Sequence, residues 1–185
     1  ADVVLAGGVA FNLLPEYFVA LSALGALSAR GSFPFDERAD GFIPAEGAGV
    51  VVLKRLRDAE AERDRILAVV AGLGFSSDGR GHSLFAPSPA GQARAVQRAL
   101  DAAAVVPAWV DLIEAHGPGS KSSDACETAA YARVFADRDP DQPVAIGSIK
   151  SQVGHTSSAG GALGLVKTTL ALRSRQLPPM NGGSG

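Results

Sequence analysis

Short apolar runs alternate along the chain with stretches in which apolar residues recur at helical spacing. The runs are rich in β-branched or small residues and are bounded by Gly, Pro or Asp; they predict strands over residues 3–9, 48–54, 66–73, 109–115 and 144–149. Helices are predicted over residues 15–24, 91–104, 124–136 and 162–175. Because strands that alternate with helices form layered sheets, and because these strands are apolar throughout, we expect an α/β fold with a sheet buried on both faces.

Length and charge exclude several classes of protein. The 185 residues suit one domain, and 17 Lys plus Arg against 19 Asp plus Glu leave a net charge of −2. Such a balance offers no basic surface for nucleic acid, and the apolar runs are too short to span a membrane. The single cysteine, Cys126, excludes an internal disulfide and a thiolate zinc cluster. We therefore expect a cytoplasmic protein without nucleic-acid, membrane or metal partners.

Both ends of the chain have the character of cut ends. The sequence starts at Ala1 inside a predicted strand, without an initiator Met. Residues 181–185 read Asn-Gly-Gly-Ser-Gly, the composition of a flexible linker. We expect part of a longer protein, with a domain over residues 1–180 and a flexible tail over 181–185.

Polar side chains follow the last two predicted strands. His116 comes directly after one strand, and Lys150 and His155 follow the other. Ligands in α/β folds usually bind beyond the carboxyl ends of strands, and the flanking glycines leave both imidazoles accessible. An imidazole can hydrogen-bond a developing oxyanion or move a proton near neutral pH. Lys150 adds a positive charge that Asp124 or Glu127 could balance.

Several other polar residues have simpler structural interpretations. Asp124 and Glu127 have the spacing of a helix N-cap and a first-turn carboxylate. Asp36 and Asp40 fit turn or cap positions, and His82, which follows a glycine, fits an ordinary surface residue.

Two further motifs favour structure over chemistry. Gly72-Leu73-Gly74 lacks the third glycine and the downstream acid of a dinucleotide site. Cys126 lies in a predicted helix without an evident activating base, which indicates a structural thiol. From spacing alone, His116 and His155 remain open to either a catalytic or a surface role.

A series of motifs then occurs in a recognisable order. They are Gly-Gly-Val at 7–9, F-D-x-x-A-D-G-F at 35–42, E-G-A-G-V-V-V-L-K at 46–54, D-G and A-P at 78–79 and 86–87, E-A-H-G at 114–117, G-S-I-K at 147–150, G-H at 154–155 and G-A-L-G-L-V-K at 161–167. In this order they resemble the later part of a β-ketoacyl synthase, the condensing enzyme of fatty-acid and polyketide assembly. The last motif is more similar to the multidomain, type I, synthases. The resemblance runs from Ala1 to about Pro179.

The resemblance implies a thiolase-like α/β fold, in which two similar halves stack and usually form a homodimer. This chain would supply the carboxyl-terminal half plus one strand of the amino-terminal half. Without the missing amino-terminal half, an apolar packing face would lie open to solvent.

The resemblance also implies roles for the charged and imidazole residues. Histidines at the places of His116 and His155 bind the thioester oxygen of a malonyl group and stabilise the enolate formed as carbon dioxide leaves. Lys150 matches the lysine that supports this site. Asp124 and Glu127 match acids that hydrogen-bond around that lysine.

The substrate arm is expected at two neighbouring positions. Pro118 and Ser120 correspond to family threonines that grip the phosphopantetheine of acyl carrier protein, but only Ser120 keeps a hydroxyl. Ser123 stands where the family has a glycine. The resemblance implies no directly bound cofactor, because acyl and malonyl thioesters arrive on the carrier protein's phosphopantetheine.

The family nucleophile, a cysteine, lies before the stretch that begins at Ala1, and Cys126 does not occupy its place. We therefore expect the chain alone to be inactive in condensation, which needs a covalent acyl-enzyme. Three hypotheses stay open: part of a complete acyltransferase, a non-catalytic scaffold or carrier-protein docking module, and a decarboxylase that needs only the histidine pair.

Overall fold

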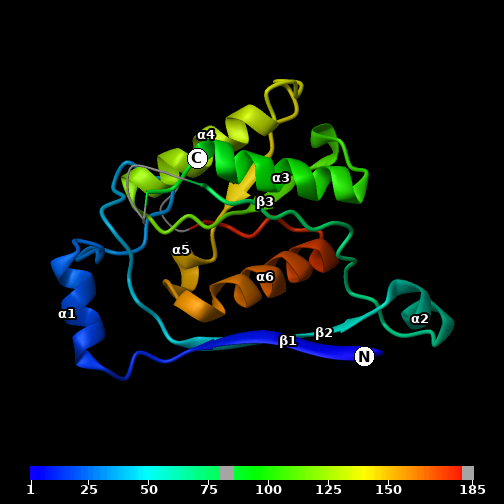
Figure 1. The fold of residues 1–185 in the computed structure, drawn as a ribbon, viewed down its shortest axis with the longest axis horizontal. Coiled ribbons are helices and arrows are strands. Elements are labelled where there is room, and N and C mark those ends of the chain that lie inside the picture. The colour runs from blue at the N-terminus through cyan, green and yellow to red at the C-terminus, as the bar shows by residue number, and fades with distance from the viewer. Residues whose placement is uncertain (80–85, 181–185) are drawn as a thin grey trace.

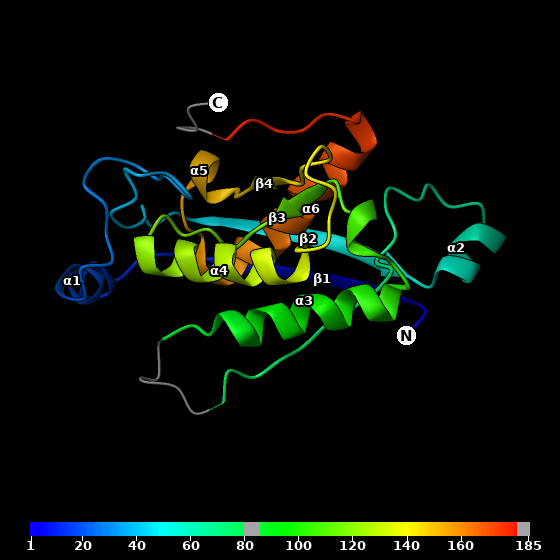
Figure 2. The same ribbon diagram turned by 90° about the horizontal axis from the view of Figure 1, so that it is seen from above.

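A computed structural model describes residues 1–79 and 86–180 of the protein. The elements, in chain order, are β1 (Val3–Ala10), α1 (Pro15–Ala23), β2 (Gly47–Lys54), α2 (Leu56–Ala61), α3 (Pro89–Ala103), η1 (Pro107–Trp109), β3 (Leu112–Glu114), α4 (Lys121–Val134), β4 (Ala145–Gly147), α5 (Lys150–Val153), η2 (Ser157–Ala159) and α6 (Gly160–Ser174). Figure 1 shows a layered arrangement in which α6 lies between the β1–β2 pair and the β3–β4 pair. On the far side of β3–β4, α3 and α4 lie side by side (Figure 2). His82 and the predicted tail over 181–185 lie outside the described residues.

The β1–β2 pair is an antiparallel ribbon with small residues facing α6. Gly8 lies opposite Gly49 in the register. A Cβ atom at Gly8 would lie 2.3 Å from the carbonyl oxygen of Ser158, and one at Gly49 would lie 3.2 Å from Ala162. Because glycine has no side chain, η2 and the start of α6 approach the ribbon backbone closely.

The other face of the ribbon is open and apolar. Leu5, Val9, Val50 and Val52 alternate with the residues that face α6, and they are 51–72% exposed. The expectation of burial on both faces is therefore wrong for this ribbon within the described residues. An open apolar face, in contrast, was expected and is present.

The β3–β4 pair is parallel and short, with Leu112 opposite Ala145 and Glu114 opposite Gly147. Both strands lie inside the ranges that the sequence predicts. The N–H of Ala115 donates to the carbonyl oxygen of Gly147, at 2.8 Å, so the pairing continues to the end of β3. As a result, the loops that follow the two strands emerge side by side.

The strand predicted over residues 66–73 is wrong, since the structure has neither strand nor helix there. The segment is exposed apart from Gly72, and it approaches α3 at Gly72 and Gly74. Cβ atoms at Gly72 and Gly74 would lie 2.4 and 1.9 Å from the carbonyl oxygens of Ala99 and Ala95 on α3. Both glycines let the segment lie against the helix, but no strand in the described part of the chain pairs with it.

The four predicted helices are present as α1, α3, α4 and α6, but the predicted start of α4 is wrong. The helix begins at Lys121, with Ser120 as the N-cap residue, so Asp124 lies inside the first turn. No glycine or proline interrupts residues 120–124, and nothing prevents the helix from extending back to Ser120. In the described ranges, no helix is long and apolar enough to cross a membrane.

The contact between the ribbon and η2 makes a testable prediction. Gly8→Ala is expected to lower the free energy of unfolding by about 1–3 kcal/mol, because the new methyl group meets the backbone of Ser158. Gly161→Ala is the matched control, since no atom lies within 4 Å of its Cβ position and the change favours the helix. Thermal unfolding of both variants tests this; equal stability of the two would contradict it.

Candidate active site

The structure brings His116 and His155 together. His116 follows β3 and His155 follows α5, and their ring centroids lie 5.5 Å apart with the rings nearly perpendicular. The pair that the sequence singled out therefore forms one cluster. Two imidazoles at this distance can reach a single atom placed between them.

His155 is held by the segment that precedes β2. Its N–H donates to the carbonyl oxygen of Ile43 at 2.7 Å, and its carbonyl oxygen accepts from the N–H of Ala45 at 3.0 Å. The ring of Phe42 lies 4.7 Å from the imidazole, centroid to centroid. Backbone pairing on both sides of one residue leaves this histidine little freedom to move.

The hydrogen bonding of His155 selects one tautomer. The N–H of Ser157 donates to Nδ1 at 3.0 Å, so a neutral imidazole carries its proton on Nε2. Ser157 has a left-handed backbone, with φ of +42°, and its hydroxyl lies 3.0 Å from that of Tyr17 on α1. Burial, followed by the charge of Lys150, lowers the pKa of His155 to about 4. At neutral pH the Nε2–H of His155 is therefore a hydrogen-bond donor.

Glu127, buried on α4, fixes the backbone around His116. Its two carboxylate oxygens accept the N–H groups of His116 and Gly117 at 2.7 and 2.8 Å. The hydroxyl of Tyr131 donates to the same carboxylate at 2.7 Å, and burial together with that negative charge raises the pKa of Tyr131. Although His116 is exposed, desolvation by its neighbours and the charge of Lys150 lower the pKa of its imidazole. Both imidazoles are therefore neutral near pH 7.

Asp124 ties α4 to two loops. Its carboxylate accepts the N–H of Phe35 at 2.8 Å and that of Gly119 at 3.2 Å. The side chain is buried, which raises its pKa, while the hydrogen bonds act in the opposite direction. This acid therefore satisfies loop backbone and does not cap its helix.

Lys150 is buried and contacts the backbone of the His116 loop. Its Nζ donates to the carbonyl oxygen of His116 at 2.6 Å. Burial lowers the pKa of Lys150, whereas Glu114, Glu127 and Asp124 raise it, in that order. Within the described residues, the two acids predicted to balance Lys150 form no ion pair with it, and they act on it through space.

Three residues of the cluster were missed as individual site residues. Ser148 is fully buried, and its hydroxyl lies 3.1 Å from the carbonyl oxygen of His116. Glu114 pairs with Lys167 at 2.8 Å. The signal for Glu114 was present, because an acid that ends an apolar strand needs a buried partner.

The predicted substrate-arm residues lie directly after His116. Pro118 is buried between Gly117 and Gly119, whose φ angles are +40° and +86°. A Cβ at Gly117 would lie 2.7 Å from the ring of Phe35, so the loop needs glycine there. Ser120 is half-buried, and its hydroxyl makes no capping hydrogen bond.

Cys126 is buried on α4, and burial raises the pKa of its thiol. A buried thiol with a raised pKa is a poor nucleophile, which agrees with its interpretation as a structural residue. Among residues 1–79 and 86–180, no cluster of three or more His, Cys, Asp or Glu side chains could hold a metal ion.

Comparison with known proteins assigns this geometry to a family. The family model for the C-terminal domain of beta-ketoacyl synthase matches residues 67–183, and the model for the N-terminal domain matches residues 1–59. The chain belongs to the β-ketoacyl synthase family.

Its relatives are polyketide synthases. The chain is 47% identical over 179 residues to a mycocerosic acid synthase-like polyketide synthase of Mycobacterium tuberculosis, covering 96% of this chain and 8% of that protein. It is 46% identical over 176 residues to erythronolide synthase EryA3 of Saccharopolyspora erythraea, covering 94% of this chain and 6% of that protein. It thus spans less than a tenth of these relatives.

Solved ketosynthases confirm the thiolase-like α/β fold. The ketosynthase from module 6 of the bacillaene synthase of Bacillus subtilis 168 matches with a TM-score of 0.92 and 38% identity, over 97% of this chain and 32% of that one. The oxazolomycin ketosynthase domain OzmH KS7 of Streptomyces albus JA3453 matches with a TM-score of 0.94 and 37% identity, over 100% and 32%. The chain therefore corresponds to about a third of a ketosynthase.

The environment of His155 predicts its titration. Nitrogen NMR is expected to show a neutral ring protonated on Nε2 down to about pH 4. His155 has a pKa of 6.5 in the unfolded chain and of about 4 in the folded one, so between these values the unfolded state binds more protons. The stability that comes from keeping His155 neutral is therefore complete above pH 6.5 and is lost as the pH falls to 4. The His155→Gln variant should show a smaller loss of stability across this window. A wild-type ring that titrates at its ordinary pKa would contradict the assignment.

Proposed function

We propose that this chain is the part of a polyketide-synthase ketosynthase that binds a malonyl-type thioester and stabilises the enolate formed on decarboxylation. The observation that carries the proposal is the His116–His155 pair, two neutral imidazoles 5.5 Å apart beside a buried lysine. Membership of the family and the similarity to polyketide synthases support it.

The chemistry follows from the polarity of the site. As the bond between the carboxylate and the α-carbon breaks, its electron pair moves into the enolate, and negative charge develops on the thioester oxygen. The Nε2–H of His155 donates to that oxygen, and the ring of His116, whose centroid lies 5.5 Å from that of His155, contacts it from the other side. The positive charge of Lys150 lies directly behind His116 and favours the anion.

Condensation needs a second thioester, in which a cysteine carries the acyl group. The enolate carbon attacks that carbonyl, and the cysteine thiolate is the leaving group. We assign this nucleophile to a residue outside the present chain, because Cys126 is buried and its pKa is raised. The chain alone is then inactive as an acyltransferase.

The substrates and partners follow the same proposal. Acyl and malonyl groups arrive on the phosphopantetheine of an acyl carrier protein. The hydroxyl of Ser120, which does not cap α4, holds this arm, while Pro118 shapes the loop. The rest of the ketosynthase, its amino-terminal half, covers the open face of the β1–β2 ribbon, and the complete domain is a homodimer.

Decarboxylation provides a direct test. In the native polypeptide that carries these residues, His155→Ala is expected to reduce release of carbon dioxide from malonyl-pantetheine by about 100-fold or more, as loss of an oxyanion donor does. Glu60→Gln, at an exposed position on α2, is the control and should leave the rate unchanged. An unchanged rate of carbon dioxide release in His155→Ala would contradict the proposed role of His155 in stabilising the enolate.

A non-catalytic docking module is the second candidate. It is favoured by Pro118, which offers no hydroxyl where the family has a threonine. Tight binding of carrier protein without any carbon dioxide release from the wild-type polypeptide would select this function. Carbon dioxide release without condensation would instead indicate a decarboxylase.

A further inference from the structure

A buried ion pair lies behind the candidate site. Glu114 ends β3, Lys167 lies in α6, and their Oε2 and Nζ atoms are 2.8 Å apart. Their side chains are only 11% and 9% exposed. Burying two charges is costly unless they meet closely, and removing one partner of such a pair leaves the other charge buried and uncompensated.

Two glycines leave space for this pair. A Cβ at Gly147 on β4 would lie 3.4 Å from Nζ of Lys167, and one at Gly164 on α6 would lie 3.2 Å from Cγ of Glu114. A side chain at Gly164 would press on Glu114, and one at Gly147 would be in contact with the ammonium of Lys167. The surrounding elements are therefore shaped around these two charges.

The second oxygen of Glu114 reaches the next loop. Oε1 accepts the N–H of Ile149 at 2.6 Å. Ile149 is the N-cap residue of α5, and Lys150 follows it directly. The carboxylate thus anchors the backbone immediately before Lys150 to the lysine of α6.

From Lys150 the connection returns to His116. Nζ of Lys150 donates to the carbonyl oxygen of His116, two residues beyond Glu114. The contacts form a ring that runs from Glu114 on β3 to Ile149 and Lys150, and back to the loop after β3; Lys167 on α6 holds the ring at Glu114. A shift of Glu114 would move both ends of the Lys150 contact.

We propose that Glu114, clamped by Lys167, is a positioning residue that sets the place of Lys150 and, through it, of His116. The inference rests on the proposed function and names residues outside the group that touches substrate.

Electrostatics give this proposal a signature that simple packing would lack. Lys150 is surrounded by Glu114 on β3, Asp124 and Glu127 on α4, Lys167 on α6 and the two imidazoles. The negative charge of Glu114 raises the pKa of Lys150, whereas the positive charge of Lys167 lowers it. Removing the charge of Glu114 should therefore lower the pKa of Lys150, and removing the charge of Lys167 should raise it.

The experiment compares Glu114→Gln, Lys167→Met and the double variant in the native polypeptide, with malonyl-pantetheine as substrate. Each single variant is expected to lower kcat for decarboxylation by about tenfold or more, with a smaller change in KM, because misplacement acts on the reacting geometry. The alkaline limit of the pH–rate profile should fall in Glu114→Gln and rise in Lys167→Met. The double variant is expected to keep the low kcat of the single variants, because no ion pair is left to fix the side chain at position 114, while its alkaline limit returns toward that of the wild type because the two opposite shifts cancel.

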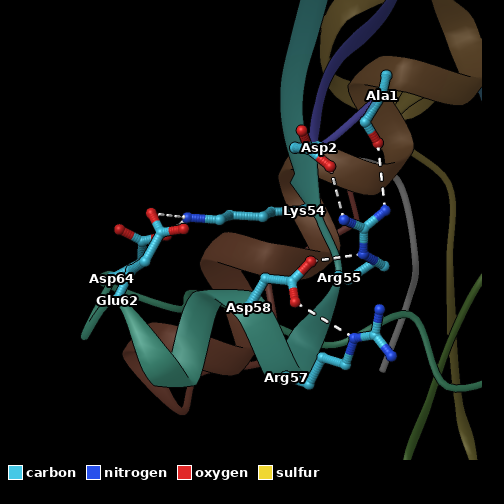
Figure 3. Close-up of polar contacts among 8 residues, drawn as sticks. All are labelled: Ala1, Asp2, Lys54, Arg55, Arg57, Asp58, Glu62 and Asp64. Carbon is cyan, nitrogen blue, oxygen red and sulfur yellow. Dashed lines mark hydrogen bonds and ion pairs between the residues drawn. The ribbon is translucent and has the colours of Figure 1, made fainter.

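A second ion-paired lysine supplies the matched control. Lys54, whose side chain is 15% exposed, pairs with Glu62 and Asp64 at the end of β2 (Figure 3). Lys54 lies at the end of β2, seven residues after Gly47. It is therefore about 23 Å along the strand from the end next to the segment whose backbone pairs with His155. Lys54→Met is expected to leave kcat and the pH profile unchanged.

The outcomes separate the inference from the proposed function. A wild-type polypeptide that releases no carbon dioxide refutes the proposed function. An active wild type, together with singles that keep its kcat and pH limits, refutes the positioning role. If the alkaline limit moves in the same direction in Glu114→Gln and Lys167→Met, the role is also refuted, because opposite charges must shift the pKa of Lys150 in opposite directions. If Lys167→Met fails to fold, Lys167→Arg keeps the charge and should restore folding and rate, whereas a folded but inactive Lys167→Arg would contradict the inference.

Discussion

Backbone hydrogen bonding in the loop after β3 is the constraint on which the rest of the site depends. Glu127 accepts the N–H groups of His116 and Gly117, and Asp124 accepts that of Gly119. The residue between the glycines is proline, which has no N–H to satisfy. Two acids one helical turn apart on α4 therefore meet every backbone donor from residue 116 to 119. A loop satisfied in this way keeps its position without help from a ligand.

The same acids create an electrostatic balance that favours neutral imidazoles. Negative charge on α4 and β3 retains a buried, positive Lys150, and that positive charge helps to keep His116 and His155 unprotonated. Neutral rings donate hydrogen bonds without bringing a net charge of their own. The site thus combines donors with one nearby cation, an arrangement complementary to an oxyanion that forms only during reaction.

Much of this arrangement could be predicted from sequence, and the failures have physical causes. Four of the six α-helices in the described residues, four of the five predicted strands and the proximity of His116 and His155 follow from periodicity and from the placement of polar residues after strands, whereas the short helices α2 and α5 were not predicted. The prediction of a strand over 66–73 failed because an apolar run forms a strand only where a neighbouring strand pairs with it, and no described strand does. Asp124 was assigned as a cap because spacing cannot show that distant loop N–H groups compete for the same carboxylate. The partnership of Glu114 and Lys167 joins residues 53 positions apart, which no local pattern reveals.

His155 shows why the two parts of the chain act as one unit. It lies in the region matched by the C-terminal family model, yet its backbone is paired with Ile43 and Ala45 in the region matched by the N-terminal one. Those residues directly precede β2, whose small residues allow α6 to lie against the ribbon. A fragment that began at residue 67 would retain both histidines, but it would lose the backbone that holds one of them. The segment before β2 is therefore as much a part of the site as the loops that carry the imidazoles.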